Sequence, residues 1–226
     1  YSQAGEIISG LDLTSPTYDG EAHLPSVLPD ATINFEDQDV LDNYKVFYQT
    51  DGFNWIPVQF LVGYKPDNVL YGEGSGYAGK SCAPVDAGVY KLKYKNIATG
   101  EETIIQNYEI KKADVEIINA PASLSTRYGE QINIATSDTY AVHKTIPTLK
   151  VTGNFVLTDT LLEASGTADL ITAETSIEFI PTGDDANNYN TAIVNDVTVS
   201  LDPVAYSGST YYSSVEYATK MVTSTG

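Results

Sequence analysis

The feature that most constrains the fold of this chain is a strict alternation of apolar and charged side chains. Over residues 89–95, tyrosine and leucine occupy every second position inside the segment, and lysines occupy the positions between them. Residues 107–111 alternate in the same way, with Tyr108 and Ile110 between polar neighbours. A period of two with one apolar face is typical of an antiparallel strand that is buried on one side. The chain is therefore predicted to be built from half-buried β-strands.

A short joint separates these strands from the rest of the chain. Lys112-Ala113-Asp114 interrupts the alternation, and Val115 and Ile117 then begin a further strand. A length of 226 residues suits two ordinary domains, so we interpret the joint as a domain boundary. The predicted organisation is a first module at 1–113 with an aromatic-rich insertion, a second module at 114–202, and a tail or the start of a following domain at 203–226.

Two motifs frame the first module in a fixed order. The opening motif is Tyr18-Asp19-Gly20-Glu21-Ala22-His23-Leu24-Pro25, and the closing motif is P-x-DAG-x-Y followed by NY-x-I-x-KA within residues 84–113. Together they resemble the YDG-type, or MBG-type, immunoglobulin-like repeat of large bacterial surface proteins. The resemblance implies a surface-exposed, tandemly repeated β-sandwich, and it brings no known catalytic residues.

The second module repeats several of these signals. Its Tyr128-Gly129-Glu130 is similar to the opening motif, and FIPTGDDANNYNTA with the later VTVSL resembles the ending of many bacterial immunoglobulin-like repeats. The predicted fold class is all-β, with two tandem immunoglobulin-like β-sandwich domains and a short C-terminal strand/helix tail. Strands are predicted in this module at 132–135, 148–152, 154–158, 176–180 and 193–201.

Residues 203–226 differ in pattern from what precedes them. Ser213-x-x-Glu216 has the spacing of a helix capping box, and Val215, Ala218 and Val222 then recur at helical intervals. We predict a strand, a turn and the start of a helix, which resembles the start of right-handed parallel β-helix domains in surface proteins. The alternative is a partly ordered tail.

Composition narrows the possible partners. The formal charge is −18 with only 12 lysine and arginine residues, and we find no basic stripe; binding to nucleic acid or anionic lipid is therefore not expected. No run of 18 apolar residues exists, so no membrane insertion is expected. The single cysteine excludes an intramolecular disulfide. No signal peptide is visible, and we expect a fragment of a longer, exported protein.

Several patterns that can signal chemistry are weak here. GSGYAGKS at 74–81 fits the P-loop pattern, but Pro84 and Gly88 leave no room for the helix that must follow it. The acidic segment 34–43 and the trio Asp184, Asp185 and Asn187 are interpreted as solvated turns, with calcium binding as the alternative. His23, His143 and Cys82 lack the clustered partners of a metal or catalytic site. No catalytic residue, cofactor or metal is predicted.

The densest aromatic region lies between residues 44 and 77. Trp55 alternates with Ile56, Val58 and Phe60, so it is predicted to face away from the core, with packing under a loop as the alternative. Exposed aromatic rings stack on sugars. The predicted ligand-contact residues are Trp55, Phe53, Tyr71 and Tyr77.

The leading functional hypothesis is a structural spacer or stalk in a bacterial cell-surface or secreted protein, with neighbouring modules of the same long chain as its partners. The alternative is an adhesin module that binds host glycan or protein through residues 44–77. A third hypothesis is a non-catalytic accessory domain of a glycan-degrading enzyme. None of the three is itself an enzyme.

Overall fold

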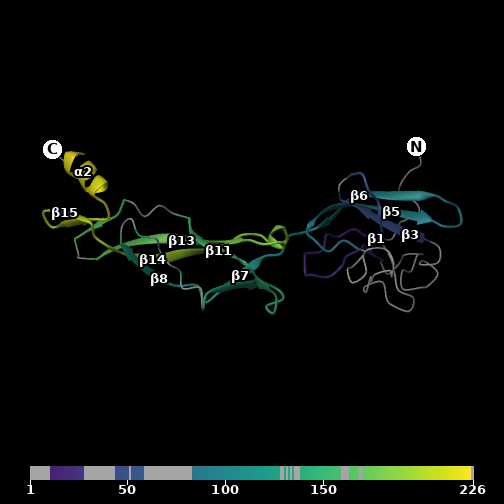
Figure 1. Cartoon of the computed structure of the whole chain (residues 1–226), viewed down its shortest axis with the longest axis horizontal. Coiled ribbons are helices and arrows are strands. Elements are labelled where there is room, and N and C mark those ends of the chain that lie inside the picture. The colour runs from purple at the N-terminus through teal and green to yellow at the C-terminus, as the bar shows by residue number, and fades with distance from the viewer. Residues whose placement is uncertain are drawn as a thin grey trace. The chain divides into compact units, whose positions relative to one another are not determined.

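The computed structural model describes residues 11–27, 44–50, 52–58, 83–127, 130, 132, 134, 138–158, 163–167 and 170–224. Over these residues the protein consists mostly of strands arranged in several sheets, which confirms the predicted all-β class (Figure 1). The chain divides into two compact units, Tyr1–Ala113 and Asp114–Gly226. That each unit is an immunoglobulin-like sandwich stays a prediction.

The first unit is built around one antiparallel sheet with the strand order β4-β3-β5-β6. Figure 1 shows β5 and β6 side by side in this unit. A second, small sheet pairs β1 (Leu11–Asp12) with β2 (Ser26–Val27). The strands of the main sheet are β3 (Tyr44–Gln49), β4 (Ile56–Val58), β5 (Gly88–Asn96) and β6 (Glu102–Ile110).

The alternation in β5 separates the two faces of this sheet as predicted. Tyr90, Leu92 and Tyr94 are buried, and the strand pairing places Val46 of β3 and Tyr108 of β6 on the same face. Burial, with the charge of nearby Asp86, raises the pKa of the Tyr90 hydroxyl to about 12. Burial likewise raises the pKa of Tyr108 to about 12. These phenols are therefore neutral at physiological pH, as an apolar core requires.

The segment before the main sheet pairs with the end of its last strand. Thr17 and Lys111 form a parallel bridge. The Tyr18 amide donates to the Lys111 carbonyl and the Lys111 amide donates to the Pro16 carbonyl, each at 2.8 Å. The opening and closing motifs therefore meet in space, although they are far apart in the sequence.

Several residues of the opening motif have a structural task. Gly20 has a φ of +85°, in the left-handed region that favours glycine. Asp19 Oδ1 accepts a hydrogen bond from the Glu21 amide at 2.9 Å and lies 2.8 Å from His23 Nε2. The His23 amide donates to the Pro84 carbonyl at 2.8 Å, which ties this turn to the closing motif. His23 therefore has a structural role in this turn.

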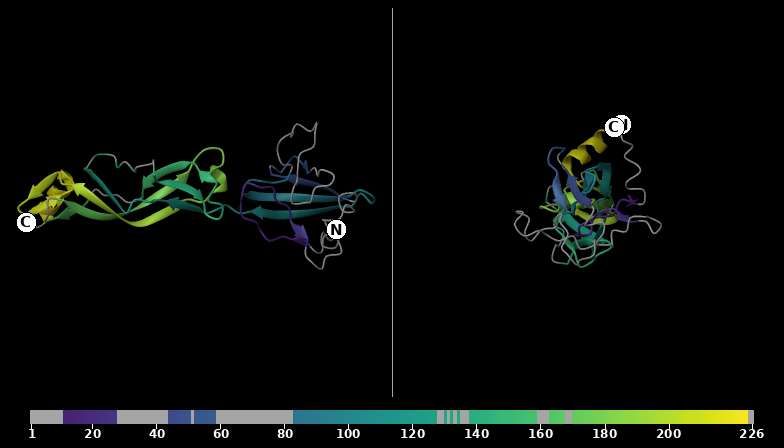
Figure 2. Two further views of the ribbon diagram at one scale, coloured as in Figure 1. Left: turned by 90° about the horizontal axis from the view of Figure 1, so that it is seen from below. Right: turned by 90° about the vertical axis from the view of Figure 1, so that its right-hand side faces the viewer.

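The second unit contains two larger sheets, and Figure 2 shows its long strands in green. Among the strands that the structure describes in this unit, neighbours are antiparallel except β14 and β8, which run parallel over five register positions from Thr198↔Ser123 to Asp202↔Arg127. One sheet has the order β11-β13-β14-β8 and the other the order β10-β9-β7. Their strands are β7 (Val115–Ile118), β8 (Ser123–Arg127), β9 (Tyr140–His143), β10 (Lys150–Val151), β11 (Gly153–Leu157), β13 (Ile171–Pro181) and β14 (Ala192–Asp202).

The predicted strands of this unit agree with the structure in most places. The predictions at 148–152, 154–158, 176–180 and 193–201 overlap β10, β11, β13 and β14. Strands β8 and β9 were not predicted. Of the predicted strand 132–135 only residues 132 and 134 are described, and neither belongs to a strand.

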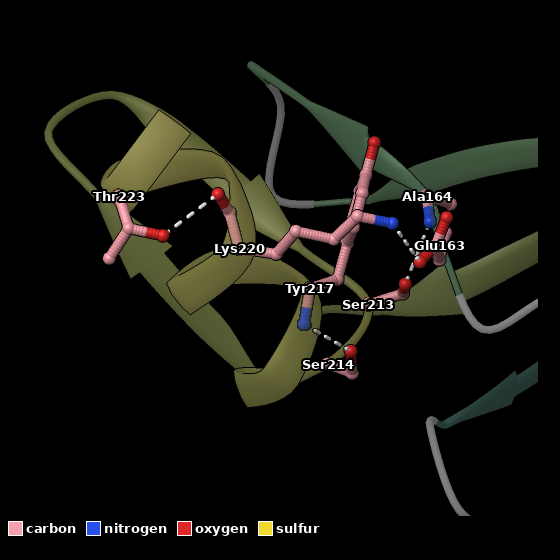
Figure 3. A network of polar contacts seen from close by, with 7 residues as sticks. All are labelled: Glu163, Ala164, Ser213, Ser214, Tyr217, Lys220 and Thr223. Atoms are coloured by element: carbon pink, nitrogen blue, oxygen red, sulfur yellow. Dashed lines mark hydrogen bonds and ion pairs between the residues drawn. The ribbon is translucent and has the colours of Figure 1, made fainter. Parts of the chain in front are cut away.

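Residues 203–226 belong to the second unit. A small sheet joins β12 (Ser165–Gly166), β16 (Thr210–Tyr212) and β15 (Ala205–Ser207), and helix α2 (Val215–Ser224) follows it. Lys220 of α2 forms an ion pair with Glu163 at 2.7 Å (Figure 3). The predicted strand–turn–helix is therefore present, and it packs against an earlier segment of the same unit.

The predicted capping box is wrong by one residue. Ser214, not Ser213, caps α2, because its Oγ accepts a hydrogen bond from the Tyr217 amide at 3.0 Å (Figure 3). The Ser213 hydroxyl instead accepts a hydrogen bond from the Ala164 amide at 2.9 Å. Ser213 therefore bonds to a residue that is distant in the sequence, and not to the helix that the local pattern predicted it to cap.

Gly153 allows β11 to approach β13 closely. A Cβ atom at this position would collide with the carbonyl oxygen of Ile180 and with the ring of Phe179. The Phe179 ring is buried and packs against Phe155 with ring centroids 5.0 Å apart. The space beside Gly153 is thus filled by a backbone oxygen and a buried ring.

We expect Gly153→Ala to lower the free energy of unfolding by about 1–3 kcal/mol, because an inserted methyl group overpacks this core. Gly166 is the matched control, since it also lies in a strand of the second unit and a Cβ atom added there would meet nothing within 4 Å. Gly166→Ala should change stability by less than about 0.5 kcal/mol. Urea unfolding of the full chain measures both. Equal losses in the two variants would contradict the packing described for Gly153.

Candidate functional site

The candidate site is the face of the β4-β3-β5-β6 sheet opposite its buried face. Phe47 of β3 lies directly across from Lys93 of β5 and from Pro57 of β4. The ammonium of Lys93 lies 4.9 Å from the ring centroid of Phe47 and 4.7 Å from that of Trp55. A cation at these distances from two rings is held by their negative faces. We call Phe47, Trp55 and Lys93 the aromatic–lysine cluster.

The carboxylate of Glu102 lies beside the cation of this cluster. Glu102 of β6 lies 3.6 Å from the Lys93 ammonium and 3.2 Å from that of Lys95. The hydrogen bond from Lys95, with the charges of both lysines, holds the pKa of Glu102 below its usual value. The side chain of Lys93 is only 15% exposed, whereas that of Lys95 is 44% exposed. Lys93 is thus a fixed element of the face, and Lys95 is open to solvent.

Strand pairing extends the lysines into a row. Lys45 of β3 lies directly opposite Lys95, and Lys91 precedes Lys93 on the same side of β5. Lys45 and Lys91 are exposed. The expectation that the chain has no basic stripe is therefore wrong for this face, because the register of β3 against β5 adds Lys45 to the lysines of one strand. We call Lys45, Lys91, Lys93 and Lys95 the lysine row.

Two of the four predicted ligand-contact residues can be placed. Phe53 lies in the turn between β3 and β4 and is 86% exposed, which is unusual for a phenylalanine. Trp55 is half-buried and belongs to the aromatic–lysine cluster, on the side away from the core that the alternation predicted. Tyr71 and Tyr77 lie outside the described residues.

His143 holds a turn. It is 1% exposed, and its Nδ1 accepts hydrogen bonds from the amides of Thr145 at 3.2 Å and Ile146 at 3.1 Å. In the first unit Asn96 Oδ1 accepts from the amides two and three residues further along, at 2.9 and 3.0 Å. The imidazole nitrogen therefore performs the same turn-capping task as an asparagine oxygen, and not the task of a catalytic base.

The remaining candidates add no further site in the part of the chain that is described. Residues 34–43, residues 74–81 and Cys82 lie outside it. Asp184 and Asp185 are exposed in the turn before the short 3₁₀ helix η1 (Ala186–Asn188). Among the described residues no group of three histidine, cysteine or acidic side chains is placed to hold a metal ion, and no helix is both long and apolar enough to cross a membrane.

No protein-family model matches this chain, and neither a curated protein nor a solved structure matches it. Membership of the YDG-type repeat family therefore stays a prediction that rests on the two motifs.

We expect Lys93→Met to destabilise the first unit by about 0.5–2 kcal/mol, because it removes a desolvated cation held between two rings. Because Trp55 is the only tryptophan, its fluorescence emission should also shift. The control is Lys91→Met, an exposed lysine on the same face of the same strand, which should change stability by less than about 0.5 kcal/mol. Denaturant unfolding followed by tryptophan emission measures both. Identical behaviour of the two variants would show that the cluster has no energetic role.

Proposed function

We propose that this chain is a structural spacer of a bacterial cell-surface or secreted protein, formed by two immunoglobulin-like β-sandwich units in tandem. The observation that carries the proposal is common to both units. Each pairs a segment near its start in parallel with a segment near the end of its main sheet, at Thr17↔Lys111 in the first unit and between β8 and β14 in the second. A shared and uncommon pairing supports two copies of one architecture.

The points where the chain enters the second unit and where it leaves the main sheet lie at opposite ends of β14. In the second unit the chain enters beside the start of β14, since Asn190 Nδ2 donates to Asp114 Oδ1 at 3.0 Å. It leaves the main sheet at the far end of β14, where Asp202 lies opposite Arg127. An 11-residue strand spans roughly 35 Å at about 3.3 Å per residue. Each such unit adds length to the chain that contains it, which is what a spacer requires.

Three described polar side chains that hold turns also favour an architectural role. Asp19, Asn96 and His143 hold turns through hydrogen bonds to nearby amides. A net charge of −18 makes neighbouring copies repel one another, which keeps extended chains apart. The assignment to a bacterial surface or secreted protein rests on the YDG-type resemblance.

A second candidate function is adhesion through the 44–77 region. The 86% exposure of Phe53 favours it, because an apolar ring held in water at a turn is suited to contact with a ligand. The aromatic–lysine cluster lies on the adjoining strands. This role is compatible with a spacer, since a module that adds length can also present a binding face.

Small-angle X-ray scattering of the full chain tests the spacer proposal. A compact globule of 226 residues has a radius of gyration of about 17 Å. We expect a clearly larger value, because two units in tandem extend the molecule. The forward scattering must correspond to a monomer of 24.4 kDa, so that dimerisation is not mistaken for extension. A monomer with a radius of gyration near 17 Å would refute the proposal.

A further inference from the structure

Lys45 and Lys95 form a pair of like charges on the lysine row, of which Lys95 also contacts the Glu102 carboxylate at 3.2 Å. They are directly opposite each other on neighbouring antiparallel strands, a position where like charges destabilise a sheet. The ion pairs of this face within the described residues both go to Glu102, from Lys93 and Lys95. Lys45 and Lys91 have no such carboxylate there. An anion that binds beside these lysines would offset the repulsion, and a local cost of this kind is typical of a functional surface.

The lysine row also has the opposite sign to the rest of the protein. The described part of this face has four lysines, Lys45, Lys91, Lys93 and Lys95, against the two carboxylates of Glu102 and Glu109. The whole chain has 30 acidic residues against 12 basic ones. Charges more than about 8 Å away are screened at physiological ionic strength, so among the described residues the charges nearest to a ligand on this face are mostly positive.

Aromatic rings lie among these lysines. Phe47 and Trp55 flank the Lys93 ammonium, and Phe53 is exposed in the adjoining turn. Alternate positions of a strand are about 6.8 Å apart, so Lys91, Lys93 and Lys95 offer cations at regular intervals along β5. Rings and evenly spaced cations suit a ligand that has apolar ring faces and regularly repeated carboxylates.

We propose that this face binds an acidic glycan, a chain of sugars with carboxylate groups. The carboxylates pair with Lys45, Lys91 and Lys95, and the apolar faces of the sugar rings contact Trp55 and Phe53. A nucleic acid fits less well, because its backbone needs a longer basic track and the remainder of the chain is acidic. The inference names the ligand class of the adhesive role and does not depend on the spacer role.

Titration of the full chain with a hexamer of galacturonic acid tests this inference. Because Trp55 is the only tryptophan, its emission reports on the proposed face without a label. We expect a saturable change at physiological ionic strength that weakens as salt is raised further. The fully methyl-esterified hexamer, which has no charge, should bind at least about tenfold more weakly, since charge pairing supplies the affinity. A single-stranded oligonucleotide of equal charge should also bind more weakly.

Two double variants test whether the lysine row is responsible for binding. Lys45→Glu with Lys91→Glu should weaken binding at least about tenfold, because like charges then face the ligand. It should not lower the thermal midpoint, because it removes the opposed pair at Lys45 and Lys95. The control, Lys144→Glu with Lys150→Glu, makes the same charge change in the second unit and should leave the affinity within about twofold.

Four results would overturn the inference. They are no saturable signal with the acidic hexamer, equal binding of its methyl ester, tighter binding of the oligonucleotide, and equal loss of binding in the two double variants. The scattering experiment on the spacer proposal is unaffected by any of them, so each proposal fails separately.

Discussion

The parallel pairing between a segment near the start of each unit and a segment near the end of its main sheet is the constraint on which the unit depends. In the first unit two backbone hydrogen bonds join Lys111 to Pro16 and Tyr18, and in the second unit β8 lies along β14. Buried amides must find partners, and these contacts satisfy them with residues from the far end of the unit. The same contacts bring the opening motif onto the closing motif and set where the chain enters and leaves.

Strand β5 shows how one alternating pattern forms both the core and the candidate site. Its tyrosine and leucine side chains form the buried face of the first unit. Its lysines lie on the other face, where Phe47 and Trp55 hold Lys93, and Lys95 lies opposite Lys45. A change of register by one residue would exchange the two faces. The core of the unit therefore also fixes the geometry of the candidate site, because the same pairing of β3 with β5 determines both.

An element could be predicted from the sequence where its signal is local, and not where it depends on contact with residues far away in the chain. Strands with an apolar face, such as β5 and β14, are visible as alternation. Strand β8 is not, because Ser123–Arg127 is mostly polar and its place depends on backbone pairing with β14. The cap of α2 was misplaced because Ser213 bonds to Ala164, which is distant in the sequence. Three lysines of the lysine row are visible in the alternation of β5, but the fourth was missed for a related reason, since Lys45 joins Lys95 only through the register of two strands.

Amide hydrogen exchange of the full chain, followed residue by residue by NMR, tests most directly whether the opening segments close the units. The amides of Tyr18 and Lys111 donate across the pairing in the first unit, and that of Thr198 donates to Ala122 in the second. They should exchange as slowly as the strand amides of their own unit, since only unfolding of the whole unit exposes them. Exchange of these amides at the rate of an unstructured peptide, while β5 and β13 stay protected, would contradict the account.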